Sequence, residues 1–276
     1  MKSARSLDWL LFAAVLTAGP ASPARAAVAD PPKATPGSAG PEATVTLDVM
    51  VPMRDGVRLA TDVYRPAHPP PGTDGRFPVI LMRTPYNKAD AAAALVPVFV
   101  PYGYAVVIQD VRGRYHSEGR WRPIRDDPDD GFDTALWIGT QAWSNRSIGT
   151  VGTSYAGATQ HALAIAGAPY VKAMIPRNAM SDFGLYGVRH HGAFELRWFN
   201  WILTMGNATG SPYALQAAVR AAADPASARA LADLGVHVRD YVRSLPLRPG
   251  TTPLKFAPDY EAWLVEAMGH GAYDGF

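Results

Sequence analysis

The amino-acid sequence predicts an α/β fold in which helices cover both faces of a mostly parallel sheet. Apolar, strand-like runs alternate with helix-like segments from Arg76 to Pro176, a pattern typical of parallel sheets with crossover helices. A serine flanked by small residues follows one of these strands. After Arg177 only helical periodicity remains. The 276 residues, 48% of them hydrophobic, can bury one large domain or one domain with a smaller companion.

The first residues are typical of a secretory signal peptide. Lys2 and Arg5 precede the apolar stretch "LDWLLFAAVLTAG", and Ala24–Ala26 fits an A-x-A cleavage site. The apolar stretch is shorter than the ~18–20 residues that span a bilayer, which favours cleavage over a membrane anchor. We therefore predict export, to the periplasm or the medium, with no membrane attachment after cleavage of residues 1–26. Residues 27–41, rich in Ala and Pro, are predicted to form a disordered leader.

The composition excludes several kinds of site. There is no cysteine, so disulfides and thiolate metal sites are excluded. The net charge is +2 and no Lys/Arg-rich run occurs, which gives no basis for nucleic-acid binding. His190 and His191 are adjacent and would face different directions on a helix, and no other His/Asp/Glu spacing is typical of a metal site. No metal or cofactor is expected.

The predicted elements begin with a hairpin. Residues 44–66 alternate apolar and polar side chains on both sides of Asp55-Gly56, a dipeptide that favours a tight hairpin turn. Residues 76–83 form a continuous apolar run, as expected for a strand covered on both faces. The further elements expected before residue 177 are a helix over 89–103 limited by Pro97 and Pro101, a strand over 104–110, a helix over 129–143 that Asp130 and Asp133 cap and charge, a strand over 147–151, a helix over 155–168 and a strand over 170–176.

The remaining residues predict a helical cap. We assign 42–180 to the N-terminal part of the α/β domain and 181–276 to an incomplete cap without convincing strands. The aromatic cluster of Trp198, Phe199 and Trp201 is expected to pack in the cap core, although a cap can also line a substrate pocket. In the loop after the 104–110 strand, Arg112, Arg114 and Glu118 are expected to form salt bridges that support the loop, and the less favoured alternative is that they bind an acidic substrate.

Ser154 stands in the sequence Gly152-Thr153-Ser154-Tyr155-Ala156, between a predicted strand and a predicted helix. A nucleophile elbow needs a serine on a sharp strand-to-helix turn, with small residues two positions before and after it. The helix N-terminus behind the serine favours developing negative charge. The alternative is a serine that only caps the helix. The strand before it and the helix after it favour a catalytic nucleophile and an α/β-hydrolase fold.

Two tyrosines are candidate donors to the oxyanion that such a nucleophile creates. The backbone N–H of Tyr155 follows the nucleophile directly, which is the usual position of one donor. Tyr86 lies in the loop after the 76–83 strand, where Pro85 stiffens the turn and the phenol could donate a second hydrogen bond. From spacing alone, surface packing is the commoner role for a loop tyrosine.

Seven blocks stand in order from about Val45 to the last residue: "VPMRDGVRLATDVYRP", "VILMRTPYNK", "QDVRGRYHSEGRW", "DGFDTALWIGTQAWSN", "VGTSYAGATQ", "RHHGAFELRWFNW" and "DYEAWL…HGAYDGF". Together they resemble the CocE/NonD hydrolases. This resemblance implies a nucleophile at Ser154, a phenolic oxyanion donor at Tyr86, a backbone donor at Tyr155 and a cap over the active site after about Ser181. It also implies hydrolysis of a small ester or a short peptide-like amide, as in X-Pro dipeptidyl-peptidases, through an acyl-serine.

The sequence departs from that family after the cap. The family places the triad Asp after a further strand, then the His, then a jelly-roll domain, whereas this sequence stops at Phe276. Asp274 follows no apolar strand and precedes no His, so it is a poor candidate. We therefore expect a fragment without the catalytic Asp and His, and the alternative is a non-catalytic remnant that binds a ligand or partner. The acyl group, ester against amide specificity and any homo-oligomer stay open. The seven histidines, His68, His116, His161, His190, His191, His237 and His270, lie where packing or surface roles are commoner than catalysis.

Overall fold

A computed structural model describes most of the α/β domain and parts of the region after it. The predicted signal peptide, the leader, much of the predicted cap, and Asp274, His237 and His270 lie outside the described residues. The described residues are 43–69, 74–180, 187–198, 201–202, 225–226, 229, 243, 248–251, 253–256 and 258–269.

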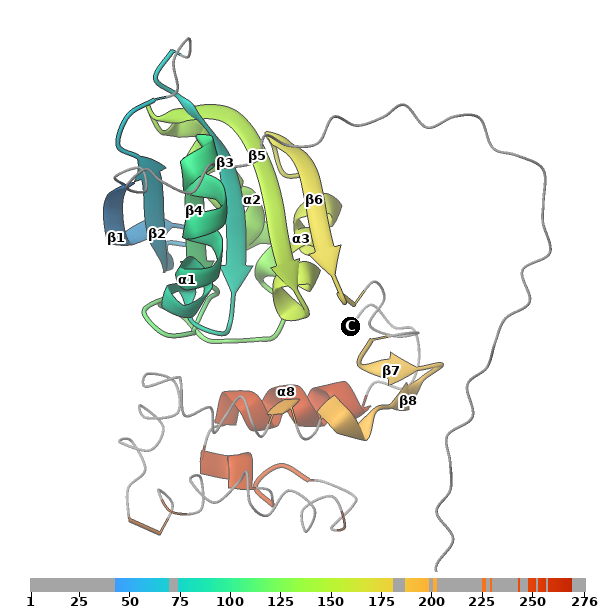
Figure 1. Cartoon of the computed structure of the whole chain (residues 1–276). Coiled ribbons are helices and arrows are strands. Elements are labelled where there is room, and N and C mark those ends of the chain that lie inside the picture. The colour runs from blue at the N-terminus through green and yellow to red at the C-terminus, as the bar shows by residue number, and fades with distance from the viewer. Residues whose placement is uncertain are drawn as a thin grey trace, which may run out of the picture. The chain divides into compact units, whose positions relative to one another are not determined.

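Six strands form one mixed, mostly parallel sheet in the order β1-β2-β4-β3-β5-β6, as Figure 1 shows. The β1/β2 and β2/β4 pairs are antiparallel, while the β4/β3, β3/β5 and β5/β6 pairs are parallel. This arrangement confirms the fold class expected from the sequence. The strands are β1 (Ala43–Pro52), β2 (Arg58–Pro66), β3 (Phe77–Thr84), β4 (Ala105–Asp110), β5 (Ser144–Thr153) and β6 (Val171–Arg177).

The β1–β2 hairpin turns where Asp55-Gly56 predicted it. Gly56 has φ 86°, which a residue with a side chain rarely adopts, and the Met53 N–H donates to the Val57 carbonyl at 2.8 Å. A β-bulge lies between Thr46 and Val49, with Asp48 at φ 52°. The bulge turns the Asp48 backbone N–H toward the Asp62 carboxylate, which accepts it at 2.8 Å.

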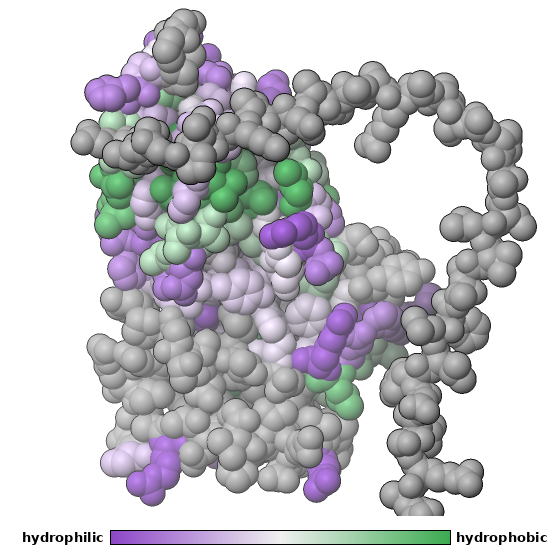
Figure 2. Space-filling model, viewed as in Figure 1, coloured by the Kyte–Doolittle hydropathy of each residue, from purple (hydrophilic) through white to green (hydrophobic). Residues whose placement is uncertain are grey.

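Helices cover both faces of the sheet. Figure 1 shows α1 (Lys88–Phe99) on one face and α2 (Asp127–Thr140) and α3 (Tyr155–Ile165) on the other. Successive β3 side chains alternate between these layers, since Ile80 clusters with Leu95 of α1, whereas Leu81 clusters with α2 and α3 side chains. Figure 2 shows a band of apolar residues across the view that faces the reader, bordered by hydrophilic side chains.

Some predicted boundaries were right and others were wrong. The helix expected over 89–103 is confirmed, since α1 ends at Phe99, between Pro97 and Pro101, and a short 3₁₀ turn follows at Val100–Tyr102. The predicted 147–151 strand is the middle of the longer β5. The capping role was wrong for both Asp130 and Asp133, because Asp126 is the N-cap residue of α2. Asp130 lies in the first turn, where its charge was expected, whereas Asp133 lies further along α2 and forms an ion pair with Arg54 at 2.9 Å.

The expectation of no strand after β6 was also wrong. A short hairpin forms from β7 (Arg189–His190) and β8 (Ala193–Phe194). Its turn places His191 and Gly192 at φ 49° and 88°, so the glycine supplies a left-handed conformation that sequence periodicity does not reveal. A 3₁₀ helix at Pro253–Phe256 and the helix α8 (Pro258–Gly269) follow. Within the described part of the chain, no helix has the length and apolar character needed to cross a membrane.

Candidate active site

The candidate site lies at the edge where the parallel strands end. Thr84 at the end of β3 pairs in register with Asp110 at the end of β4. Leu81 of β3 pairs with Thr150 of β5. Since β5 ends three residues after Thr150, Thr84, which is three residues after Leu81, is level with the end of β5. The carboxyl ends of parallel strands are where α/β folds place their ligand sites. Ser154, Tyr155 and Tyr86 follow these ends directly.

Ser154 occupies a strained turn between β5 and α3. Its backbone has φ 59° and ψ −122°, outside the regions that residues with side chains ordinarily adopt. Its N–H donates to the Arg177 carbonyl at 2.9 Å, and its carbonyl accepts from the N–H groups of Gly157 and Ala158, each at 2.9 Å. Ser154 is exposed. These are the backbone and exposure that a nucleophile elbow requires.

The two glycines around the elbow make this turn sterically possible. A Cβ on Gly152 would lie 2.4 Å from the backbone oxygen of Ala156, and a Cβ on Gly157 would lie 2.8 Å from the Cβ of Ala179. The need for a small residue at Gly152 is therefore confirmed. The short distance at Gly157 shows that the start of α3 packs closely against the segment that follows β6.

Tyr155 uses its backbone and its side chain differently. As the first residue of α3, it has an N–H without an acceptor inside the helix, so this donor can serve an oxyanion beside Ser154. Its phenol is 2% exposed and donates to Oδ2 of Asp127 at 2.8 Å. The phenol oxygen accepts the Ile124 N–H at 2.7 Å. Burial, with the Asp127 charge nearby, raises the pKa of Tyr155 well above its usual value.

Tyr86 lies in the turn that follows β3 and is 36% exposed. Its N–H donates to Oγ1 of Thr84 at 3.0 Å. The carbonyl of Pro85 accepts Nε of the buried Arg114 at 3.0 Å, and Nη1 of Arg114 donates to the Tyr260 hydroxyl of α8 at 2.7 Å. Arg114 therefore fixes the peptide that immediately precedes Tyr86. The structure thus places Tyr86 at the same sheet edge as Ser154, on a braced turn.

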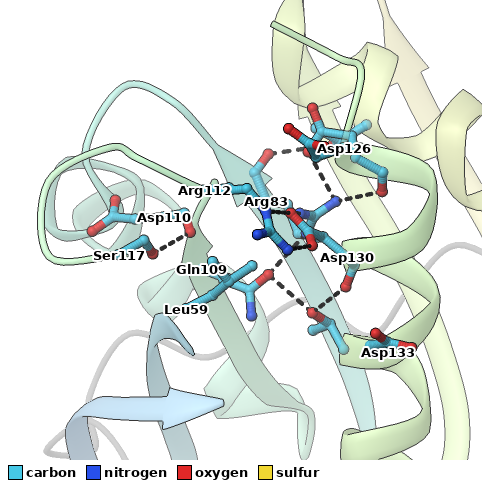
Figure 3. Close-up of polar contacts among 12 residues, drawn as sticks. Leu59, Arg83, Gln109, Asp110, Arg112, Ser117, Asp126, Asp130 and Asp133 are labelled. Carbon is cyan, nitrogen blue, oxygen red and sulfur yellow. Dashed lines mark hydrogen bonds and ion pairs between the residues drawn. The ribbon is translucent and has the colours of Figure 1, made fainter. Parts of the chain in front are cut away.

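A buried ion-pair network supports this edge, and the sequence did not reveal its centre. Arg83, 1% exposed at the end of β3, contacts Asp127 at 3.0 Å and donates Nε to Gln109 of β4 at 2.8 Å. Asp130 lies 3.8 Å from Arg83 and 2.6 Å from Arg112, and Figure 3 shows both guanidinium groups directed toward it. A charged residue within the apolar run 76–83 was the one available signal.

The loop between β4 and α2 is held by the predicted salt bridges. Arg112 forms ion pairs with Asp130 and, at 2.7 Å, with Asp55 of the hairpin turn, and hydrogen bonding to Asp130 raises the pKa of Arg112. Glu118 forms an ion pair with Arg58. The expected salt bridges are confirmed for Arg112 and Glu118, whereas the hydrogen bonds of Arg114 go to the Pro85 carbonyl and the Tyr260 hydroxyl.

Asp110 ends β4 as a buried carboxyl group. Its Oδ1 accepts the Lys88 N–H at the start of α1 at 2.8 Å, its backbone oxygen accepts the Ser117 hydroxyl at 2.6 Å, and its Oδ2 is buried with no hydrogen-bond partner among the described residues. Burial raises the pKa of Asp110 to about 7, against the opposing effect of Lys88.

This carboxyl group predicts a pH-dependent stability. Asp110 binds its proton more tightly when folded (pKa about 7) than when unfolded (3.8), so the native state loses stability as the pH rises from about 4 to 7. At roughly 1.4 kcal/mol per pKa unit, the loss is about 4 kcal/mol. Urea unfolding at pH 4.5 and 8 should show this decline for the wild type and a much smaller one for Asp110→Asn. Equal declines in both proteins would refute it.

The described histidines do not complete a triad. Nδ1 of His116 contacts Asp48 at 2.8 Å, Nδ1 of His161 contacts the Met180 carbonyl at 2.8 Å, and His190 forms an ion pair with Glu195. His68 is exposed. Within the described ranges, no histidine hydrogen-bonds the Ser154 hydroxyl, and no cluster of three His, Cys, Asp or Glu side chains could hold a metal ion.

The predicted aromatic cluster packs beside the elbow. The Trp201 ring lies 6.2 Å from the Tyr155 ring at 22°, and it also contacts Trp198 and Trp121 at 5.2 and 5.6 Å. Phe199 lies outside the described residues. Packing in a core is therefore confirmed for the two tryptophans.

Comparisons with known proteins bear on the family and the fold. Residues 55–276 match the family model described as X-Pro dipeptidyl-peptidase (S15 family). The chain is 47% identical over 144 residues to cocaine esterase from Rhodococcus sp. (strain MB1 Bresler), covering 50% of this chain and 24% of that protein. The chain thus spans about a quarter of the length of the curated relatives that it matches.

Solved structures show the same fold. A CocE/NonD family hydrolase from Staphylococcus aureus is 30% identical with a TM-score of 0.51, over 58% of this chain and 32% of that one. An α-amino acid ester hydrolase superposes with a TM-score of 0.55 at 24% identity, over 88% of this chain and 40% of that one. The chain, with its α/β-hydrolase sheet and its elbow at Ser154, belongs to the X-Pro dipeptidyl-peptidase (S15) family of CocE/NonD-like hydrolases.

Proposed function

We propose that the protein is an exported serine hydrolase that cleaves a small ester or a short peptide-like amide through an acyl-Ser154 intermediate. The observation that carries this proposal is the backbone of Ser154, held at φ 59° and ψ −122° with the residue exposed at the carboxyl end of β5. A serine that merely capped α3 would not need this conformation, and the Ser154 side chain makes no capping hydrogen bond.

The chemistry follows the acyl-serine sequence. Oγ of Ser154 attacks the substrate carbonyl carbon while its proton passes to a general base, and the carbonyl oxygen becomes an oxyanion. The Tyr155 N–H and the Tyr86 hydroxyl would donate hydrogen bonds to it. The protonated base then gives its proton to the departing alcohol or amine, and water repeats the sequence to release the acid.

The general base and the acid that orients it are proposed to come from a longer protein of which this chain is a part. Two facts support this: the curated relatives are about four times as long as the matched region, and no described histidine forms a hydrogen bond with the Ser154 hydroxyl. Without its base a serine hydroxyl is a weak nucleophile, so the chain alone would turn over very slowly.

Tyr86→Phe tests the second oxyanion donor. Removal of one donor from an oxyanion hole costs about 10²–10³-fold in kcat, and we expect a loss of that size with KM changed little. The half-buried Tyr64, whose hydroxyl lies near Asp62 on β2, supplies the matched control Tyr64→Phe. Steady-state kinetics on the complete gene product would refute the role of Tyr86 if the two variants kept equal kcat.

The reaction class can be measured with the protein isolated from its native source. p-Nitrophenyl esters should give a burst of p-nitrophenol equal to the enzyme concentration, followed by slower turnover, because the acyl-serine forms before it hydrolyses. Xaa-Pro p-nitroanilides assayed in parallel distinguish ester from dipeptidyl amide specificity. Absence of both activities would favour a chain that only binds a ligand or partner.

A further inference from the structure

We propose that Asp127 is a positioning residue that anchors the Tyr155 phenol and thereby aims the Tyr155 backbone N–H at the oxyanion. This inference rests on the proposed function and adds a residue that does not touch the substrate. Asp127 begins α2, far from Ser154 in the sequence, and its side chain reaches the residue that directly follows the nucleophile.

The phenol of Tyr155 is held from three directions. It donates to Oδ2 of Asp127 at 2.8 Å and its oxygen accepts the Ile124 N–H at 2.7 Å. The indole N–H of Trp121 lies 3.3 Å from the same oxygen. Because the hydrogen of the phenol points to Asp127, the phenol oxygen can accept hydrogen bonds from the other two donors. This directional set fixes the ring more tightly than apolar packing could.

Asp127 is itself immobilised. It is 3% exposed, and its Oδ1 contacts Nη1 of Arg83 at 3.0 Å. The same Arg83 nitrogen donates to the Asp127 backbone carbonyl at 2.9 Å, so the guanidinium binds both the side chain and the main chain of this residue. Arg83 is in turn bonded through Nε to Gln109 of β4. The anchor thus belongs to the sheet.

The charges set the direction of the critical hydrogen bond. Burial raises the pKa of Tyr155 well above its usual value, so the phenol keeps its proton. Burial raises the pKa of Asp127, and the Arg83 guanidinium that faces it opposes this effect by favouring the carboxylate form. Because the phenol oxygen accepts the Ile124 and Trp121 N–H groups, its own hydrogen points to Asp127. With Asp127 ionised, this hydrogen bond is charge-assisted and stronger than a neutral one.

The position of the anchor gives it leverage on catalysis. Only Cβ and Cα of Tyr155 separate its ring from the backbone amide that would bind the oxyanion. The adjacent Ser154 is in a strained conformation, which the surrounding structure must maintain. Oxyanion donors act through preorganisation, and small displacements of such groups weaken catalysis strongly. Release of the phenol should therefore weaken oxyanion binding more than substrate binding.

The test compares Asp127→Asn, Tyr155→Phe and the double variant in the complete gene product. The probe is an alkyl trifluoromethyl ketone, whose carbonyl carbon accepts Ser154 Oγ and whose carbonyl oxygen becomes an oxyanion while the serine proton moves to the base. We expect Tyr155→Phe to lower kcat and to weaken the ketone affinity by about 10-fold or more, with KM within twofold. In the Tyr155→Phe background, Asp127→Asn should lower kcat and the ketone affinity by less than a further twofold, because Asp127 acts through the phenol.

The outcomes separate this inference from the proposed function. Wild-type protein that forms the ketone adduct while Tyr155→Phe keeps its kcat and ketone affinity overturns the role of the anchor alone. The role of the anchor is also overturned if Asp127→Asn lowers kcat and the ketone affinity by the same factor in the wild-type and Tyr155→Phe backgrounds. Wild-type protein that forms no adduct overturns the proposed function and this inference together. Loss of the buried partner of Arg83 can unfold Asp127→Asn, in which case Tyr155→Phe, which keeps that ion pair, decides, with Tyr64→Phe as its control.

Discussion

Replacement of Ser154 by alanine should reduce ester hydrolysis by a factor on the order of 10⁶, the size of loss seen when a catalytic serine is removed from a complete triad. The reason is that no other group can form the acyl intermediate, so only the oxyanion donors and substrate binding would remain. The free energy of unfolding should change little, because Ser154 is exposed and its side chain caps no helix N–H. Single-turnover and steady-state assays on the complete gene product measure this.

The control for Ser154→Ala is Ser147→Ala, at a partly exposed position on the same strand β5. That variant should keep wild-type kcat. If Ser154→Ala retained more than about a tenth of the wild-type rate, Ser154 would not be the nucleophile, and the assignment of the elbow as the reactive centre would be wrong.

Replacement of Gly152 by alanine should damage both folding and catalysis. The new Cβ would stand 2.4 Å from the Ala156 backbone oxygen and 2.7 Å from its carbonyl carbon, distances that no side-chain rearrangement can relieve. Overpacking of this kind costs about 1–3 kcal/mol, and a displacement of the nucleophile by ~1 Å can cost 10²-fold in rate. We expect a lower free energy of unfolding in urea and at least a hundredfold lower kcat.

Gly149→Ala on the same strand is the matched control. Its Cβ would lie 3.3 Å from Cδ1 of Ile80, the mobile end of a side chain that can shift. The free energy of unfolding should stay within about 1 kcal/mol of wild type and kcat within a few-fold. Equal effects of the two substitutions would mean that the elbow is less tightly packed than the structure shows.

The fold could be predicted because its signals are local. The apolar run at 76–83, the Asp55-Gly56 turn and the glycine pattern around Ser154 each depend on neighbours in the sequence. The β7–β8 hairpin was missed because its strands have two residues each, too few to show an alternating pattern.

The candidate site divides in the same way. Ser154 could be predicted from its motif, whereas the role of Tyr86 followed only from the family resemblance, because its position in a loop favoured surface packing. The anchors Asp127, Arg83 and Arg114 were not, because their partners lie far away in the chain: Asp127 meets Tyr155, and Arg114 meets Pro85 and Tyr260. Nothing in the spacing of an Asp at a helix start distinguishes a capping residue from one that reaches across the fold to a tyrosine.

Covalent labelling of the protein from its native source tests the central claim most directly. The mature protein is treated with a fluorophosphonate, its intact mass is measured, and the modified residue is located by peptide mapping. The account predicts one phosphonyl group per chain, on Ser154, in a protein heavier than residues 27–276. A protein that stays unlabelled, or that carries its label on another serine, would contradict the assignment of Ser154 as the nucleophile.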